Sequence, residues 1–172
     1  MNRLTGTIAT STLLLCFTAL PALCEDSHVG HQHHSHDTRG VELGLSAGYA
    51  YLDGEDESAP GLHIHLSKRL GQKGIMKHLA LGIGGEAIFA DHEHYALMLP
   101  FSVNAWRGLV LSVAPSIAWA KHEGEWESEY VTHLEASYVF ELGEYDMGPV
   151  VGYSSSSEEE HYMVGLHFGI HF

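Results

Sequence analysis

The last twelve residues of the chain alternate between two kinds of side chain, and this alternation constrains the fold more than any other feature. Every second position is apolar, namely Tyr162, Val164, Leu166, Phe168, Ile170 and Phe172. The positions between them hold three histidines, two glycines and Met163. Successive side chains of a strand point to opposite faces, so the pattern predicts a β-strand with one wholly apolar face.

Seven earlier segments alternate in the same way. Together with the last strand, they occupy residues 41–52, 61–70, 78–90, 95–104, 109–119, 130–140, 147–155 and 161–172. Strands of about 9 to 13 residues are long enough to cross a bilayer at a tilt. No apolar face carries a charge in mid-strand, where a charge would cost about 2–4 kcal/mol in lipid. We therefore predict an all-β protein, an eight-stranded antiparallel up-and-down transmembrane β-barrel over residues 40–172.

The composition agrees with such a barrel. The chain has 19 glycines, eight tyrosines and three tryptophans, and membrane barrels use glycine inside and aromatic residues at the two interfaces. The formal net charge of −14 argues against a nucleic-acid partner, which requires basic patches. Pro100 and Pro115 cannot donate to a strand ladder, so we expect bulges there.

The chain begins with a predicted secretory signal over residues 1–24. Arg3 supplies the positive charge, residues 8–20 are apolar, and small residues allow cleavage after Cys24. The alternative is acylation of Cys24, which the bulky Leu23 disfavours. Residues 25–39 are polar and form a predicted disordered leader.

The final strand and its C-terminal Phe172 resemble those of the small eight-stranded outer-membrane barrels: the OmpX-like and OmpW-like proteins and the transmembrane part of OmpA. The resemblance implies insertion by the barrel assembly machinery, which recognises the strand ending in Phe172. It also implies contact with lipid and lipopolysaccharide in the outer membrane of a Gram-negative cell. It implies no single activity, because such barrels include adhesins, structural anchors and lipid A-modifying enzymes.

The connections between the strands suggest an orientation. The first, third, fifth and seventh connections are acidic, whereas the second and fourth carry Lys68, Arg69, Lys73, Lys77 and Arg107. With short turns in the periplasm and longer loops outside, as is usual for these barrels, the acidic set lies outside. The leader then lies in the periplasm.

The polar faces of the strands place ionisable residues in the lumen. These residues are His63, His65, His133, His161, His167, His171, Glu42, Glu86, Glu135 and Glu141. An eight-stranded barrel is only wide enough for side chains to fill it, so a general porin is not expected. We expect His63, His65, Glu86, His133, Glu135 and His161 in the outer half, and side chains from neighbouring strands reaching over the small residues of the first strand.

These lumen residues suggest a site for a divalent transition metal. Imidazole and carboxylate groups suit zinc, copper and nickel, and His63 and His65 lie on one face about 6.5–7 Å apart. The predicted lumen ligands are His63, His65, Glu86, His133, Glu135, His161 and His167. The alternative is a hydrogen-bonded polar core, which small barrels also need.

The leader carries a second candidate metal-binding tract. It contains His28, His31, His33, His34 and His36 together with Asp26 and Asp37, a composition that indicates metal binding. The alternative is a solvated linker. Because nothing orders the tract, we expect modest selectivity among zinc, nickel and copper.

These features favour a non-enzymatic barrel with a role in metal uptake or homeostasis. A structural or adhesive barrel without a metal function is the second hypothesis. A lipid A-modifying enzyme is the third, and its nearest candidate residues are His133, Glu135 and Ser137. Alternation points all three into the lumen, away from lipid.

Overall fold

The computed structural model describes residues 40–53, 56–90, 93–122, 125–157 and 160–172. The predicted signal, the predicted leader and its five histidines lie outside these residues. The described chain forms ten strands and one short 3₁₀ helix. They are β1 (Val41–Leu52), β2 (Glu57–Arg69), η1 (Gly74–His78), β3 (Leu79–Phe89), β4 (Glu93–Met98), β5 (Phe101–Trp106), β6 (Leu109–His122), β7 (Glu125–Tyr138), β8 (Phe140–Leu142), β9 (Tyr145–Ser155) and β10 (Glu160–His171).

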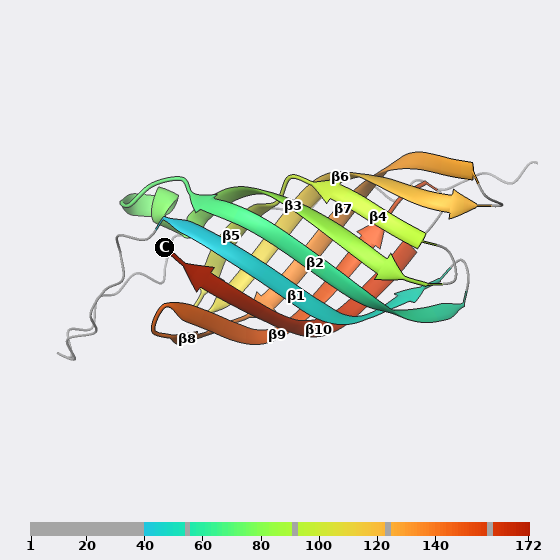
Figure 1. Ribbon diagram of the computed structural model, residues 1–172. Helices are drawn as coiled ribbons and strands as arrows, with labels where there is room; N and C mark the ends of the chain where they lie inside the picture. Colours follow the sequence, from blue (N-terminus) through green and yellow to red (C-terminus); the bar gives the residue numbers. More distant parts are fainter. Residues whose placement is uncertain (1–39, 54–55, 91–92, 123–124, 158–159) are drawn as a thin grey trace, which may run out of the picture. The chain divides into compact units, whose positions relative to one another are not determined.

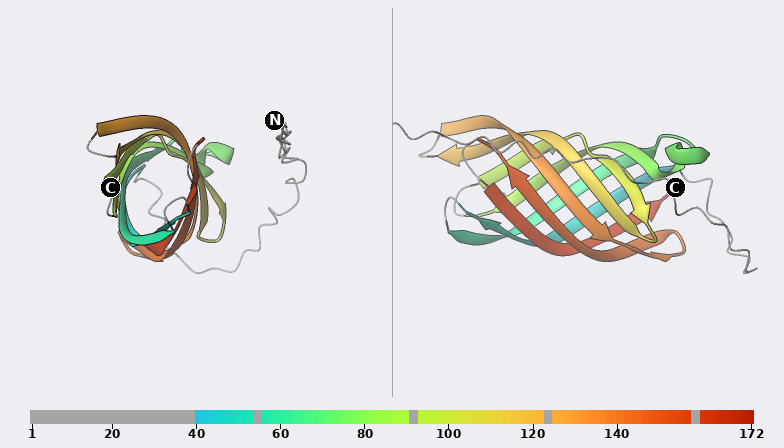
Figure 2. Two further views of the ribbon diagram at one scale, coloured as in Figure 1. Left: turned by 90° about the vertical axis from the view of Figure 1, so that its right-hand side faces the viewer. Right: turned by 180° about the vertical axis from the view of Figure 1, so that it is seen from behind.

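The strands close into a barrel (Figures 1 and 2). Each pairs antiparallel with its neighbours, and the ring closes where β1 pairs with both β2 and β10. At this seam the backbone N–H groups of Val41 and Phe172 each donate to the other residue's carbonyl, at 3.2 and 2.9 Å. β4 and β5 together fill one position between β3 and β6, and β7 and β8 follow one another along β9. The barrel therefore has eight strand positions, which confirms the predicted fold.

The two prolines lie at one break in the sheet. β4 pairs with β6 as far as Met98 opposite Ser116, and β5 resumes with Phe101 opposite Val113. The residues between, Leu99 and Pro100, separate β4 from β5, whereas β6 runs through Pro115 without interruption. The expected irregularity thus occurs at Pro100 but not in Pro115's own strand. The carbonyl of Pro115 still accepts from Leu99 N–H at 3.1 Å.

Five strands begin earlier than the sequence pattern predicted, among them β4 at Glu93 and β10 at Glu160. β2 begins at Glu57, β7 at Glu125 and β9 at Tyr145. The added residues pair with the facing strand, but several are polar because a hairpin that extends beyond the bilayer has no need of an apolar outer face. The turn before β6 is tight: Arg107 and Gly108 have φ of 39° and 89°, as in the two-residue turns that suit β-hairpins.

The outer surface of the barrel is apolar. Leu166 is 69% exposed whereas its neighbour His167 is 4% exposed, so the predicted alternation of faces is confirmed. The exposed aliphatic residues form a continuous belt that includes Leu45, Ile64, Leu66, Ile83, Leu97, Leu111, Val113, Ile117, Leu134, Val151, Val164 and Leu166. A belt of this kind is stable only against lipid, which makes this a transmembrane barrel.

Aromatic side chains flank the belt at both ends of the barrel. One end, here called the loop end, holds the β1–β2, β3–β4, β6–β7 and β9–β10 connections; its exposed rings include Tyr49, Tyr51, Tyr95, Trp126, Tyr130 and Tyr162. The other, the terminal end, holds Val41 and Phe172; its exposed rings include Trp106, Tyr138, Phe140, Tyr145 and Phe168. Such girdles mark the two membrane interfaces. Among the described residues, no helix is both long and apolar enough to span a bilayer.

The inside of the barrel has an apolar region and a polar region. A small apolar cluster of Ala50, Leu52, Ala59 and Ile88 fills part of the lumen near the loop end. The remaining buried side chains include serines, histidines and an aspartate. The polar part of the lumen contains the candidate site.

Candidate metal-binding lumen

Three lumen side chains come together near the loop end. Nε2 of His161 (β10) lies 3.4 Å from Oε1 of Glu86 (β3), and Nδ1 of His133 (β7) lies 3.8 Å from the same oxygen. One ligand atom from each residue lies within 4.8 Å of the other two. We call Glu86, His133 and His161 the loop-side triad. All three were predicted ligands, and the barrel brings them together from three strands.

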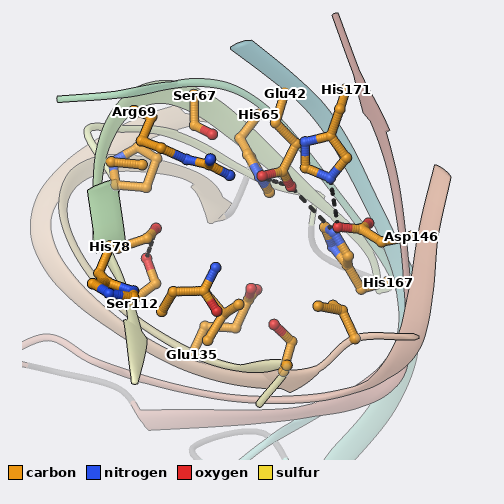
Figure 3. Close-up of a pocket in the computed structure, with 18 of the residues that line it drawn as sticks. Glu42, His65, Ser67, Arg69, His78, Ser112, Glu135, Asp146, His167 and His171 are labelled. Carbon is orange, nitrogen blue, oxygen red and sulfur yellow. Dashed lines mark hydrogen bonds and ion pairs between the residues drawn. The ribbon is translucent and has the colours of Figure 1, made fainter. Parts of the chain in front are cut away.

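A second group lies near the terminal end. Nε2 of His167 (β10) lies 3.4 Å from Oε1 of Glu42 (β1) and 3.6 Å from Oδ1 of Asp146 (β9). These residues also offer three ligand atoms within 4.8 Å of one another. We call Glu42, Asp146 and His167 the terminus-side triad. Figure 3 shows their side chains close together in the lumen.

Two further histidines flank the terminus-side triad. Nε2 of His171 lies 2.8 Å from Oδ2 of Asp146, and Nε2 of His65 lies 3.5 Å from Oε1 of Glu42. The rings of His65 and His167 stack with centroids 5.6 Å apart. A cation bound by this triad would therefore lie near the imidazoles of His65 and His171.

His63 and Glu135 link the two halves of the lumen. Nδ1 of His63 lies 3.2 Å from Oε2 of Glu135, on the opposite wall of the barrel. The rings of His63 and His65 are 5.2 Å apart, but each histidine faces a different carboxylate. The structure therefore does not gather His63 and His65 around one carboxylate, and neither belongs to a triad.

The predicted heights in the lumen differ from the observed ones on β2 and β7. Glu135, predicted in the outer half, lies in the terminal half of β7 because this strand begins at Glu125. Since β2 begins at Glu57 and not at Gly61, His63 lies at mid-strand and His65 in the terminal half. Glu141, the remaining predicted lumen carboxylate, is exposed on β8 and lines the cavity at the terminal end.

Asp146 is the candidate ligand that the sequence analysis did not place in the lumen. The sequence pattern placed it in a turn, but it is the second residue of β9 and its side chain is buried. Extending the alternation of β9 by two residues would have found it, because Asp146, Gly148 and Val150 all face inward. Glu42 and His171 were predicted to face the lumen but were not predicted ligands.

Gly44 on β1 leaves the space that the terminus-side rings occupy. A Cβ at this position would overlap the ring of His65 and lie 2.9 Å from Cε1 of His167. The expectation that neighbouring side chains reach over the small residues of the first strand is confirmed here.

Several buried polar atoms lack a hydrogen-bond partner within the described part of the chain. They include Nε2 of His63, Nε2 of His133 and Oδ1 of Asp146. A buried polar atom without a partner is costly, and a bound cation would satisfy such nitrogen and oxygen atoms. The donor set of imidazoles and carboxylates fits zinc, copper or nickel.

Comparisons with known proteins concern the fold alone. No protein-family model matches the sequence, and no curated protein matches it. Among solved structures, Neisserial surface protein A matches at 11% identity over 77% of this chain and 97% of its own, with a TM-score of 0.55. The N-terminal β-barrel domain of Pseudomonas aeruginosa OprF matches at 12% identity over 76% and 97%, with a TM-score of 0.55. This chain shares the fold of these small barrels.

A third solved structure, Ail, the attachment invasion locus protein of Yersinia pestis, is 13% identical over 77% of this chain and 97% of its own. Its TM-score is 0.44. The resemblance stated from the sequence is confirmed by the first two structures at the level of the fold.

Proposed function

We propose that this protein is an outer-membrane barrel that binds divalent transition-metal ions in its lumen, in a role in metal uptake or homeostasis. One observation carries the proposal: two buried groups each offer three nitrogen and oxygen ligands within 4.8 Å. Three protein ligands with room for water or a further imidazole are a common arrangement for zinc.

The alternative, a purely structural polar core, accounts less well for the lumen. A core of that kind is stable when each buried polar atom has a hydrogen-bond partner. Nε2 of His63 and of His133 has none within the described residues. Six histidines also face the same lumen, and neutral imidazole is the commonest metal ligand in proteins.

The proposed location is the outer membrane of a Gram-negative cell, with the loop end outside. Asp53, Asp56, Glu57, Glu125 and Glu127 lie at the loop end, and Lys68, Arg69, Lys73, Lys77 and Arg107 lie at the terminal end. In this orientation the leader, with His28, His31, His33, His34 and His36, is periplasmic. It would bind ions on that side as a second, less selective ligand set.

Calorimetric titration of the refolded barrel with zinc, nickel and copper tests the proposal. A His133→Ala/His161→Ala variant and an Asp146→Asn/His167→Ala variant separate the two triads, and removal of residues 25–39 separates the leader from the lumen. Each pair of substitutions should weaken binding at its own triad by at least about tenfold. Binding that disappears with the leader alone, or no binding at all, would favour the structural or adhesive hypothesis.

Lipid modification has less support from the lumen geometry. His133, Glu135 and Ser137 all face inward on β7. Four residues of strand separate His133 from Ser137 by about 13 Å, which is beyond hydrogen-bond reach. A deletion strain with altered lipid A would support this third hypothesis.

A further inference from the structure

We infer that the two triads are successive stations on one path through the barrel, and that a metal ion moves between them by exchanging ligands with His63, Glu135 and His65. The inference rests on the proposed binding of metal in the lumen. It adds a transport step to that function.

Three cavities follow one another along the lumen. The largest, about 90 Å³, opens at the terminal end and is lined by the terminus-side triad residues Glu42, Asp146 and His167. A second, of about 20 Å³, shares His63 and Glu135 with the first. A third, also of about 20 Å³, shares Glu86 and His133 with the second. At each junction, two of the shared residues are candidate ligands.

The ligands along this series are closely spaced. Between the terminus-side triad and the middle of the barrel, the ring centroids of His167, His65 and His63 are separated by 5.6 and 5.2 Å. Nδ1 of His63 lies 3.2 Å from Oε2 of Glu135. Because metal–nitrogen bonds to zinc are about 2.0–2.1 Å long, one ion can bond to both His63 and Glu135. Nε2 of His65 and Nε2 of His167 both lie within 3.5 Å of Oε1 of Glu42, so Glu42 can pass an ion from one ring to the other.

Each stage of the path also supplies negative charge. Glu86 belongs to the loop-side triad, Glu135 lies at the middle, and Glu42 and Asp146 belong to the terminus-side triad. A divalent cation in a narrow lumen loses most of its hydration shell. The free-energy cost of this loss is offset only where negatively charged groups lie close to the cation. No lysine or arginine lines the second or third cavity.

Both ends of the path are open to cations. Glu129 and His94 line the third cavity near the loop end, and Oε2 of Glu129 is buried without a hydrogen-bond partner among the described residues. At the terminal end, the first cavity is lined by Arg69 and Lys77 together with the carboxylates of Glu42, Glu135, Glu141 and Asp146. Carboxylates outnumber lysine and arginine side chains at both ends, so each end of the path attracts cations.

Zinc entry into vesicles tests the inference. The full mature barrel is reconstituted into phosphatidylcholine vesicles that contain a zinc-sensitive dye, and zinc is added outside. The test variant is His63→Gln/Glu135→Gln, whose amides can still hydrogen-bond to each other but are poor ligands for transition metals. The matched control is Ser112→Ala, which lies at the junction of the first and second cavities and hydrogen-bonds to Ser102.

We expect saturable zinc entry with the wild-type barrel and with the Ser112→Ala control. The His63→Gln/Glu135→Gln variant should slow entry by at least about tenfold, while calorimetry still detects zinc at both triads. Equal entry through the variant and the wild type, or two bound ions without entry, would overturn the path while leaving metal binding intact. A wild-type barrel that binds no zinc would refute the proposed function itself.

Discussion

The hydroxyl of Ser46 lies 3.1 Å from Nδ1 of His167, while Nε2 of the same ring faces the carboxylates of Glu42 and Asp146. A partner on one nitrogen of an imidazole fixes the ring orientation and leaves the other nitrogen to coordinate a metal. In the loop-side triad, Oγ of Ser154 lies 2.6 Å from Nδ1 of His133, the nitrogen that also lies 3.8 Å from Glu86, and Nε2 of that ring has no hydrogen-bond partner among the described residues. Each triad thus contains a histidine held by a serine of the neighbouring strand.

The Ser46→Ala substitution should weaken zinc binding at the terminus-side triad by about tenfold, because the ring of His167 loses its orienting partner. Calorimetry on the refolded barrel measures this effect. Ser67→Ala removes another buried lumen hydroxyl on a nearby strand and should leave the affinity unchanged. Equal losses in the two variants would mean that the hydroxyl acts through general packing and not through His167.

The Gly44→Ala substitution should impair the same triad by displacing two rings. The added methyl group meets His65 and His167, so zinc affinity at that site should fall by about tenfold. Gly152→Ala is the matched control, because a Cβ at Gly152 makes only an ordinary contact, 3.5 Å from the Cβ of Met163. Unchanged affinity in Gly44→Ala would show that the rings are not required in their present positions.

Zinc should stabilise the folded barrel against urea. For one site, free zinc at about 100 times its dissociation constant adds about 2.7 kcal/mol to the free energy of unfolding. A chelator should reverse this increase. The His133→Ala/His161→Ala variant should keep only the part that comes from the terminus-side triad, and an undiminished increase would place the stabilising ion elsewhere.

A charge on the outer face should cost stability according to its depth. Leu166 lies at the middle of β10 and points outward, so Leu166→Arg should reduce the free energy of unfolding in a bilayer by about 2–4 kcal/mol. Tyr162→Arg, on the same face near the aromatic girdle, should cost about 0–1 kcal/mol. Equal costs at both positions would argue against the assigned membrane span.

Phe172→Ala should affect assembly in cells more than stability. Its ring is 58% exposed, whereas the seam depends on its backbone N–H and carbonyl, which alanine retains. We therefore expect normal refolding into vesicles and a reduced amount of protein in outer-membrane fractions. A comparable loss in both measurements would indicate that the ring stabilises the barrel itself.

The sequence predicted the barrel and the facing of its residues because a strand's period of two leaves only two choices for each side chain. His167 and Leu166 fall on opposite faces for that reason alone. Alternation is harder to read where β2 and β7 extend beyond the bilayer and the outer face is free to be polar. Asp146 was missed although Tyr145 and Met147 continue the exposed apolar face of β9 on either side of it. The sequence also could not show that Glu135 meets His63 across the lumen, because such meetings depend on the tilt and stagger of all the strands.

The backbone bonds between Val41 and Phe172 also constrain how this protein reaches its membrane. The first and last strands are neighbours, so the sheet cannot close until the whole chain has been delivered. Until then, two rows of unpaired amide and carbonyl groups would face hydrocarbon, where each costs several kcal/mol. During insertion, the backbone groups of these two strand edges must therefore either remain in contact with water or pair temporarily with a strand of another protein.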